Sequence, residues 1–184
     1  ATSVRAALPV GRIVASTGEP GAERCAAGQA WTWDGVGFTV LHPDVADYGS
    51  ERKANNLSCV LRVEAGGRRM LLTSDIEARD EALLLARAGP ELAADVLLVP
   101  HHGSRTSSTP EFVAAVDARE AVIPVGYRNR FGHPKAEVLE RYEAGGVRVW
   151  RTDRDGALRL RLAPNGVTVS AWRDERRRYW QAAR

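Results

Sequence analysis

The stretch Val96-Leu97-Leu98-Val99-Pro100-His101-His102-Gly103-Ser104 decides which fold this chain is expected to have. Its four consecutive apolar residues, all valine or leucine, are typical of a strand that is covered on both faces of a sheet. Pro100 cannot donate a hydrogen bond to a neighbouring strand, so the strand ends there. Two adjacent histidines, a glycine and a serine follow at once. In α/β folds such strand ends commonly hold ligands and metals, and half of the four histidines of the chain lie at this one point.

Length and composition indicate an ordinary globular domain. The chain has 184 residues, of which 44% are hydrophobic and 27% charged, and its formal net charge is +3. These values favour one domain, or a domain with a tail. No apolar run reaches the roughly 18 residues that a membrane helix needs. The chain does not begin with methionine and its first residues do not form a signal peptide, so we expect a piece of a longer protein.

Local patterns place hairpins first and helix–strand units after them. Asp-Gly and Gly-Gly pairs between alternating runs are hairpin signals, and Thr-Pro-Glu is a helix start. The predicted strands are 12–15, 31–33, 38–41, 57–63, 70–73, 96–99, 121–126, 147–150, 158–162 and 167–172. The predicted helices are 77–89, a helix that begins at 109–111, and 135–144, with a surface loop at 44–56. This order predicts an α/β fold with mixed sheets and flanking helices in a domain spanning residues 1–172. An Arg-rich tail at 173–184 follows it.

Three polar clusters come directly after apolar strands. They are Ser74-Asp75, His101-His102-Gly103-Ser104 and Gly132-His133. If the three strands are neighbours in a sheet, a carboxylate and two or three imidazoles converge at one edge. Such oxygen and nitrogen donors suit Zn²⁺ or Mn²⁺, and an imidazole beside a phosphate can act as a general acid or stabilise charge.

Purely structural roles remain open for the same residues. An aspartate after a strand is often a turn or helix-cap residue, and a single histidine at a strand end is often a satisfied polar group. His42 is expected to be structural, and Ser104 has an alternative role as a loop or cap residue. Arg128 and Arg130 would ordinarily form a solvated face.

The two cysteines, Cys25 and Cys59, fit neither a CxxC metal pair nor a redox motif. They are either two free buried thiols or a disulfide. A disulfide closing a loop of this length would add about 3–4 kcal/mol to stability in the chain-entropy account. It would also indicate an oxidising compartment.

Four spaced motifs together resemble the C-terminal domain of the ComEC family, the DNA-uptake proteins of natural competence. The resemblance covers about residues 10–163. The motifs are Asn55-Asn56-Leu57-Ser58, Leu71-Leu72-Thr73-Ser74-Asp75-Ile76-Glu77, Val99-Pro100-His101-His102-Gly103-Ser104 and Arg130-Phe131-Gly132-His133-Pro134. The resemblance implies the second part of a metallo-β-lactamase-like fold. It also implies a metal-dependent nuclease that degrades one strand of incoming DNA while the other enters through a membrane channel.

The resemblance also assigns roles to single residues. Asp75 matches the family's bridging metal carboxylate, although most relatives have glycine where this chain has Ser74. His102 is favoured over His101 as a metal ligand, which leaves His101 either to support the metal ligands or to contact phosphate. His133 matches a histidine expected near the scissile phosphate.

Further residues are expected to contact DNA or to add a metal ligand. Ser104, Arg105, Arg128 and Arg130 are the expected contacts to the DNA backbone. His42 lies roughly where the superfamily often has a further ligand.

The main metal motif of the superfamily, His-x-His-x-Asp-His, is absent from this chain. We therefore expect Mn²⁺ or Zn²⁺ in the longer protein, and an incomplete ligand set and no activity in this piece. An uncovered sheet face or edge in the piece predicts a homo-oligomer. The expected partners are DNA, as a single strand or a duplex end, and the channel domain of the parent protein. That parent would lie in the bacterial inner membrane, with this domain on the periplasmic face.

Two non-enzymatic readings remain open beside the nuclease. One is a single-stranded DNA-binding module in which Tyr127 and Phe131 stack on bases. The other is a purely structural part of the uptake channel.

Overall fold

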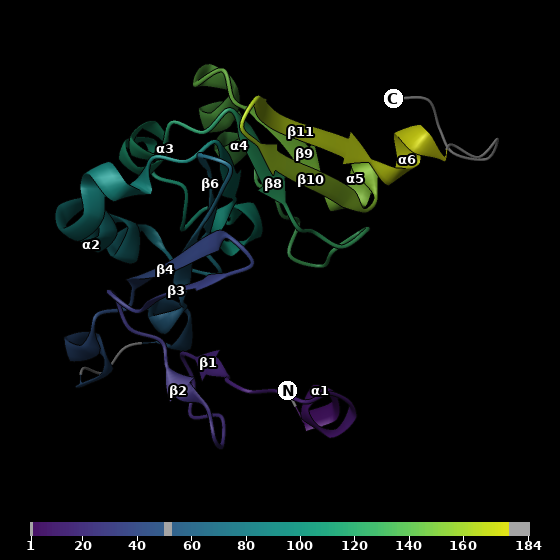
Figure 1. Cartoon of the computed structure of the whole chain (residues 1–184). Coiled ribbons are helices and arrows are strands. Elements are labelled where there is room, and N and C mark those ends of the chain that lie inside the picture. Colours follow the sequence, from purple (N-terminus) through teal and green to yellow (C-terminus); the bar gives the residue numbers. More distant parts are fainter. Residues whose placement is uncertain (1, 50–52, 177–184) are drawn as a thin grey trace.

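A seven-stranded mixed sheet forms the centre of the computed structural model, which describes residues 2–49 and 53–176 (Figure 1). The strand order is β3-β4-β5-β6-β7-β8-β9, so each strand lies beside its neighbour in sequence. Pairing is antiparallel from β3 to β6 and parallel from β6 to β9. The strands are β3 Ala30–Trp33, β4 Val36–His42, β5 Val60–Ala65, β6 Arg68–Leu72, β7 Val96–Leu98, β8 Glu120–Ile123 and β9 Arg148–Arg151. The predicted α/β class with mixed sheets is confirmed.

Three helices cover one face of this sheet. They are α2 Ala78–Ala88, α3 Pro110–Val116 and α4 Ala136–Ala144. The hydroxyl of Thr109 accepts a hydrogen bond from the backbone N–H of Phe112 at 3.4 Å, and Pro110 occupies the first helical position, so α3 begins where the sequence predicts. The main core lies between these helices and the sheet, with Leu71, Leu97 and Ile123 facing it from the strands.

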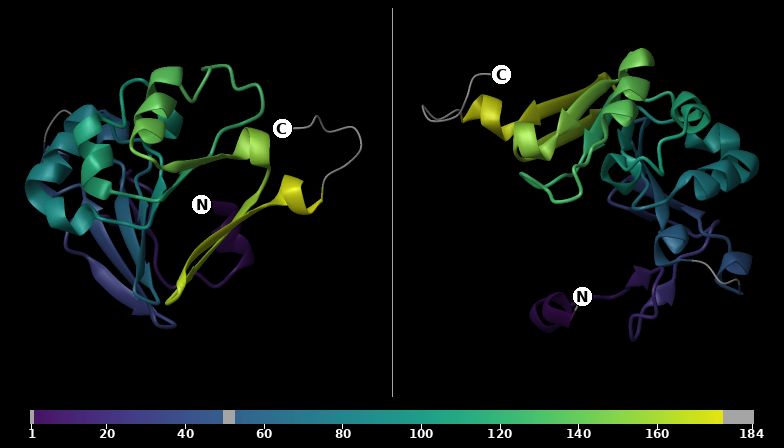
Figure 2. Two further views of the ribbon diagram at one scale, coloured as in Figure 1. Left: turned by 90° about the horizontal axis from the view of Figure 1, so that it is seen from above. Right: turned by 180° about the vertical axis from the view of Figure 1, so that it is seen from behind.

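The hairpin β10 Leu158–Ala163 and β11 Gly166–Ala171 lies on the opposite side of the sheet from the helices (Figure 2). Its apolar side closes a second, smaller core with Val96, Val122 and Trp150. The hairpin covers the sheet mainly over its parallel half, because these three residues belong to β7, β8 and β9. The two strands are joined by a turn at Pro164 and Asn165, between the paired residues Ala163 and Gly166.

The remaining elements are short. The helices are α1 Thr2–Ala7, α5 Thr152–Asp155 and α6 Trp172–Glu175. The 3₁₀ turns are η1 Val45–Gly49, η2 Ala54–Leu57, η3 Gly89–Leu92 and η4 Pro100–Gly103. Two paired strands, β1 Val14–Ala15 and β2 Glu23–Arg24, precede the main sheet. Figure 1 shows α1 lying apart from the main sheet.

Several predicted boundaries are wrong. The strand predicted at 12–15 is only two residues long and pairs in parallel with β2, which the sequence did not suggest because Glu23 and Arg24 are polar and exposed. Leu57 lies in η2 and not in a strand. The strand predicted at 121–126 ends at Ile123, one residue before a proline. Of the predicted tail and loop, residues 177–184 and 50–52 lie outside the described residues.

Cys25 and Cys59 form a disulfide bond, with their Cα atoms 6.1 Å apart, so the alternative of two free thiols is wrong. The Tyr48 hydroxyl donates a 2.7 Å hydrogen bond to the Cys25 carbonyl, and the Ser74 hydroxyl donates a 3.1 Å hydrogen bond to the Cys59 carbonyl. The disulfide therefore fixes the segment around Cys59, which lies beside Ser74 at the end of β6. Among the described residues, none of the helices combines the length and the apolar character needed to cross a membrane.

Candidate functional site

The three predicted polar clusters follow three neighbouring parallel strands. Leu72 of β6 is in register with Leu98 of β7, and Leu98 with Val122 of β8. The carboxyl ends of these strands therefore share one edge of the sheet. The backbone ties the clusters together there, since His101 N–H donates to Ser74 O and Lys135 N–H donates to Gly103 O, each at 2.9 Å.

Asp75 and His102 form a close pair at this edge. His102 Nε2 lies 3.4 Å from Asp75 Oδ1, and His102 Nδ1 lies 2.7 Å from the carbonyl oxygen of Pro124. A carbonyl can only accept, so Nδ1 carries a hydrogen and donates it. In the neutral ring Nε2 then carries no hydrogen, and its lone pair faces a carboxylate oxygen of Asp75. Two such atoms repel unless a proton or a cation lies between them, and histidine ligands of metals commonly donate their other nitrogen to a carbonyl in this way.

His101 makes different contacts. Its Nδ1 lies 3.6 Å from Glu77 Oε1 and 3.5 Å from the hydroxyl oxygen of Thr106. The Thr106 hydroxyl itself donates to Glu77 Oε1 at 3.1 Å. His101 Nδ1 is therefore oriented by an acid and a hydroxyl, while its Nε2 has no hydrogen bond to the described residues. Such a ring can exchange a proton with a ligand through Nε2.

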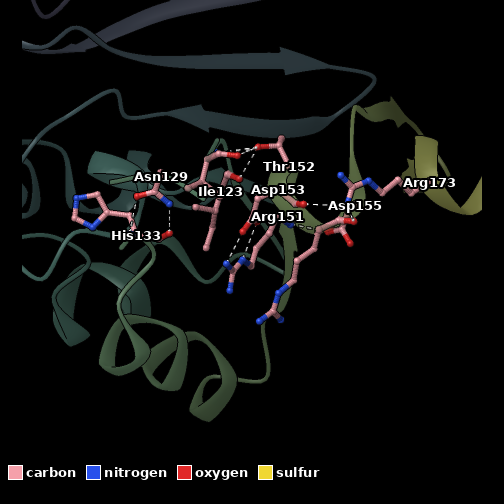
Figure 3. Close-up of polar contacts among 10 residues, drawn as sticks. Ile123, Asn129, His133, Arg151, Thr152, Asp153, Asp155 and Arg173 are labelled. Carbon is pink, nitrogen blue, oxygen red and sulfur yellow. Dashed lines mark hydrogen bonds and ion pairs between the residues drawn. The ribbon is translucent and has the colours of Figure 1, made fainter. Parts of the chain in front are cut away.

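His133 is held by its backbone and by stacking. Asn129 clamps it, because Asn129 Oδ1 accepts from His133 N–H at 3.0 Å and Asn129 Nδ2 donates to His133 O at 2.7 Å (Figure 3). Its ring stacks on Phe131 with centroids 5.9 Å apart and lies 6.1 Å from the ring of His101. Burial, and then the positive charge of Lys135, lower the pKa of His133 below its usual value. Its neutral form is therefore favoured.

The far side of the edge is supported by α5. The Thr152 hydroxyl donates to Val125 O at 2.8 Å and accepts from Val125 N–H at 2.7 Å (Figure 3). Because Val125 follows Pro124, whose carbonyl accepts from His102, this contact fixes the acceptor that orients the imidazole.

Three residues of the site have backbone angles that normally favour glycine. Ser74 has φ 49°, and His101 and His102 have φ 47° and 55°. Left-handed conformations of side-chain-bearing residues each cost roughly 1–2 kcal/mol. Such strain gathers at functional sites and persists where the surrounding structure over-determines it. Ser74, where most relatives are expected to have glycine, thus adopts the same conformation that a glycine would supply.

The predicted DNA-contacting residues lie in three different settings. Ser104 is buried and its hydroxyl oxygen lies 3.2 Å from that of Thr106, as a loop residue would be. Arg105 is exposed and its Nε donates to Glu137 at 2.6 Å. Arg128 and Arg130 are both exposed on the loop between β8 and α4.

His42 also reaches this edge, at the end of β4, but it is buried. Its Nε2 lies 3.0 Å from the carbonyl oxygen of Asn56. This contact agrees with the structural role expected for His42.

Sequence reasoning did not select Glu77, Thr106 and Asn129 for the site. Asn129 precedes His133 by four residues, a spacing that could have suggested a loop clamp. Glu77 could have been noted because it follows Asp75 by two residues. Thr106 gives no local signal, since only the folded loop brings it to Glu77.

The described residues do not form a complete metal site. Among residues 2–49 and 53–176, no group of three or more His, Cys, Asp or Glu side chains is placed to hold a metal ion. Asp75 and His102 provide two donor atoms, whereas a structural zinc site uses about four protein ligands and a catalytic one about three. We therefore derive no chemical step that passes through a metal on this chain.

Solved structures resemble the chain over part of its length. A proposed metal-dependent hydrolase from Parabacteroides distasonis is 13% identical, with a TM-score of 0.45 over 77% of this chain and 64% of that one. A proposed zinc-dependent hydrolase of the metallo-β-lactamase superfamily from Thermotoga maritima is 19% identical, with a TM-score of 0.33 over 60% of this chain and 50% of that one. No model of a protein family matches the chain.

Curated relatives are more similar in sequence. Competence protein ComA of Neisseria gonorrhoeae is 42% identical over 179 residues, which is 95% of this chain and 25% of ComA. ComE operon protein 3 of Bacillus subtilis is 39% identical over 73% of this chain and 17% of its own length. Recombination protein 2 of Haemophilus influenzae is 34% identical over 79% of this chain and 18% of its own length. The chain spans about a quarter or less of these relatives, and it is homologous to that portion of the ComA/ComEC competence proteins.

Proposed function

We propose that this chain is the part of a DNA-uptake protein that supplies one side of a nuclease site. The observation that carries the proposal is the Asp75–His102 pair, 3.4 Å apart, on the same sheet edge as His101 and His133. Similarity to competence proteins supports DNA as the substrate. An acid and three imidazoles at one edge support hydrolysis of a phosphodiester.

The contacts of each side chain suggest its task. His101, oriented through Nδ1 by Glu77, is placed to give a proton from Nε2 to an oxygen of the phosphate or of the leaving group. His133, with its lowered pKa, is neutral near pH 7 and suited to accept a proton. Asp75 and His102 bind the group that completes the site, and Pro124 holds His102 in the required tautomer. Ser104 would then act by shaping the loop, and Arg105, Arg128 and Arg130 by attracting phosphates.

The proposal includes a requirement for ligands beyond this chain. Mn²⁺ or Zn²⁺ in the longer protein would need donors in addition to Asp75 and His102, because the described residues offer no group of three. We therefore propose that the chain alone does not cleave DNA. The substrate would be one strand of incoming DNA, and the channel part of the parent protein would receive the other strand.

The disulfide supports an oxidising environment for this part of the protein. Structural disulfides persist outside the reducing cytosol, and Cys25–Cys59 is closed in the structure. We propose that the domain faces the periplasmic side of the inner membrane in its parent.

Self-association belongs to the same proposal. Val4 of α1 is 54% exposed and Leu8, which follows α1, is 61% exposed, and Trp31 and Phe38 on β3 and β4 are only partly buried. Apolar surface of this kind favours contacts between copies. Sedimentation of the chain should show a dimer or larger species, and a monomer at all concentrations would contradict this point.

A chimera tests the nuclease. The segment of gonococcal ComA that matches this chain is replaced by the chain itself, and the purified chimera is assayed for cleavage of end-labelled DNA with Mn²⁺ or Zn²⁺. Asp75→Asn should abolish cleavage, whereas Asp34→Asn, the same substitution at an exposed hairpin turn, should leave it unchanged. Equal cleavage by the two variants would overturn the assignment of Asp75.

The incomplete donor set also keeps a second candidate function open, a non-catalytic DNA-binding module. A chimera that binds DNA and supports uptake without cleaving would favour it.

A further inference from the structure

The loop that joins β8 to α4 is basic and carries two exposed aromatic rings. Residues 126–135 read Gly-Tyr-Arg-Asn-Arg-Phe-Gly-His-Pro-Lys and contain no aspartate or glutamate. Tyr127 is 70% exposed and Phe131 61% exposed. Two exposed rings on one loop next to a candidate site indicate a binding surface.

Each ring has an arginine beside it. The guanidinium carbon of Arg128 lies 5.2 Å from the ring centroid of Tyr127, and that of Arg130 lies 4.9 Å from the ring centroid of Phe131. Neither arginine forms an ion pair with a carboxylate among the described residues. Both cations therefore remain available to an anionic ligand while they rest against an aromatic surface.

The loop is held in shape by its own hydrogen bonds. Asn129 N–H donates to Gly126 O, and Gly132 N–H donates to Asn129 O, each at 3.2 Å. The Lys135 ammonium group donates to Phe131 O at 2.8 Å. A loop ordered in this way presents its rings without a large loss of conformational entropy on binding.

A row of rings leads from this loop to the candidate site. Phe131 and His133 stack with an interplanar angle of 16°, and His133 lies beside His101. A nucleotide whose base stacks on Phe131 would therefore place its phosphate close to His133 and His101, where the proposed cleavage takes place.

We propose that Tyr127 and Phe131 form a stacking platform for the unpaired bases of single-stranded DNA, with Arg128 and Arg130 binding the adjacent phosphates. The choice of DNA rests on the proposed function, whereas the preference for unpaired bases rests on the exposed rings. Bases in a duplex are already stacked on one another and cannot offer their faces to a side chain. Arginine contacts alone would bind single and double strands through phosphates with no such preference.

Fluorescence anisotropy of the chain in EDTA tests the platform separately from any cleavage. The probes are a labelled oligothymidylate, an abasic oligonucleotide of the same length and charge, and a duplex of that length. Wild type should bind oligothymidylate about ten-fold more tightly than the abasic strand. Phe131→Ala should remove most of this difference and leave binding of the abasic strand unchanged, whereas Phe131→Trp should retain it.

Trp33→Ala is the matched control. Trp33 is 70% exposed, as Tyr127 is, but it lies on the hairpin at the opposite end of the main sheet, so its loss should change no affinity. The proposal is overturned if wild type binds the abasic strand or the duplex as tightly as oligothymidylate. It is also overturned if Phe131→Ala weakens both single strands equally, or if oligothymidylate does not bind. If the chimera with the unchanged chain does not cleave DNA while the chain keeps this preference, the nuclease assignment is refuted and the platform stands.

Discussion

Replacing Gly103 by alanine tests whether the loop of His101 and His102 packs against Pro134, which follows His133, as the structure shows. Gly103 has φ +77°, and a Cβ atom added there would lie 2.6 Å from Pro134 Cβ and 3.1 Å from Pro134 Cα. Real Cβ atoms do not approach other carbons so closely, so one of the two loops has to move. Lys135 N–H donates to Gly103 O at 2.9 Å, which opposes that movement.

The expected loss has two parts. Alanine in a left-handed conformation costs roughly 1–2 kcal/mol, and overpacking of a buried contact costs about 1–3 kcal/mol. Gly103→Ala should therefore lower the free energy of unfolding by about 2–5 kcal/mol. For a chain of this length, each 1 kcal/mol corresponds to about 2–4 °C in Tm.

Gly67→Ala is the matched control for this prediction. Gly67 has φ +71°, but nothing lies within 4 Å of an added Cβ. Both variants lose the same backbone freedom in the unfolded state, so that contribution cancels in the comparison. The difference between the two urea-unfolding free energies then measures the contact with Pro134 alone. A difference below about 0.5 kcal/mol would refute the close packing of the two loops.

Two further predictions concern stability. Reductant should lower the free energy of unfolding by about 4 kcal/mol, because the Cys25–Cys59 bond closes a loop with a sequence separation of 34. Reductant should have no effect on a variant with serine at both positions. An effect on that variant would contradict the prediction. Burial raises the pKa of Glu81, and hydrogen bonds from the backbone N–H groups of Thr109 and Ser108 offset this only in part. The stability that this carboxyl contributes is complete below its unfolded pKa of about 4.3 and is lost as pH rises through the folded value. Glu81→Gln should therefore flatten the decline in unfolding free energy above that pH, and an unchanged slope would count against the buried carboxyl as its source.

Local signals predicted most of the fold. The Asp34-Gly35 pair predicts the hairpin whose strands meet at Trp33 and Val36, and the Thr109-Pro110 pair predicts the start of α3. The three apolar strands before the polar clusters are neighbours, as the order of elements suggests. The hairpin and the helix start depend on residues close together in the chain, and the strand neighbours follow from the order of the elements, so a sequence pattern can indicate them.

Several contacts between single residues that lie far apart in the sequence were not predictable. Glu77 meets His101 because parallel pairing of β6 and β7 places the two strand ends side by side. Thr106 reaches Glu77 only after the loop beyond the histidines has turned back toward β6. Gly103 packs against Pro134 although 31 positions in the chain separate them. Nothing in the neighbouring residues marks any of these contacts.

The backbone angles of Ser74, His101 and His102 give a reason to regard this edge as functional that does not depend on any relative. Turns that only had to connect β6 to α2 and β7 to α3 would adopt these angles without strain if glycine stood at these positions. Instead, side chains occupy all three, and the structure offsets the strain with hydrogen bonds from His101 N–H to Ser74 O, from Ser104 N–H to His101 O and from His102 Nδ1 to Pro124 O. The last of these bonds also orients the imidazole of His102 at the shared edge. The path of the backbone alone does not require this strain. The function of the three side chains explains why it is retained.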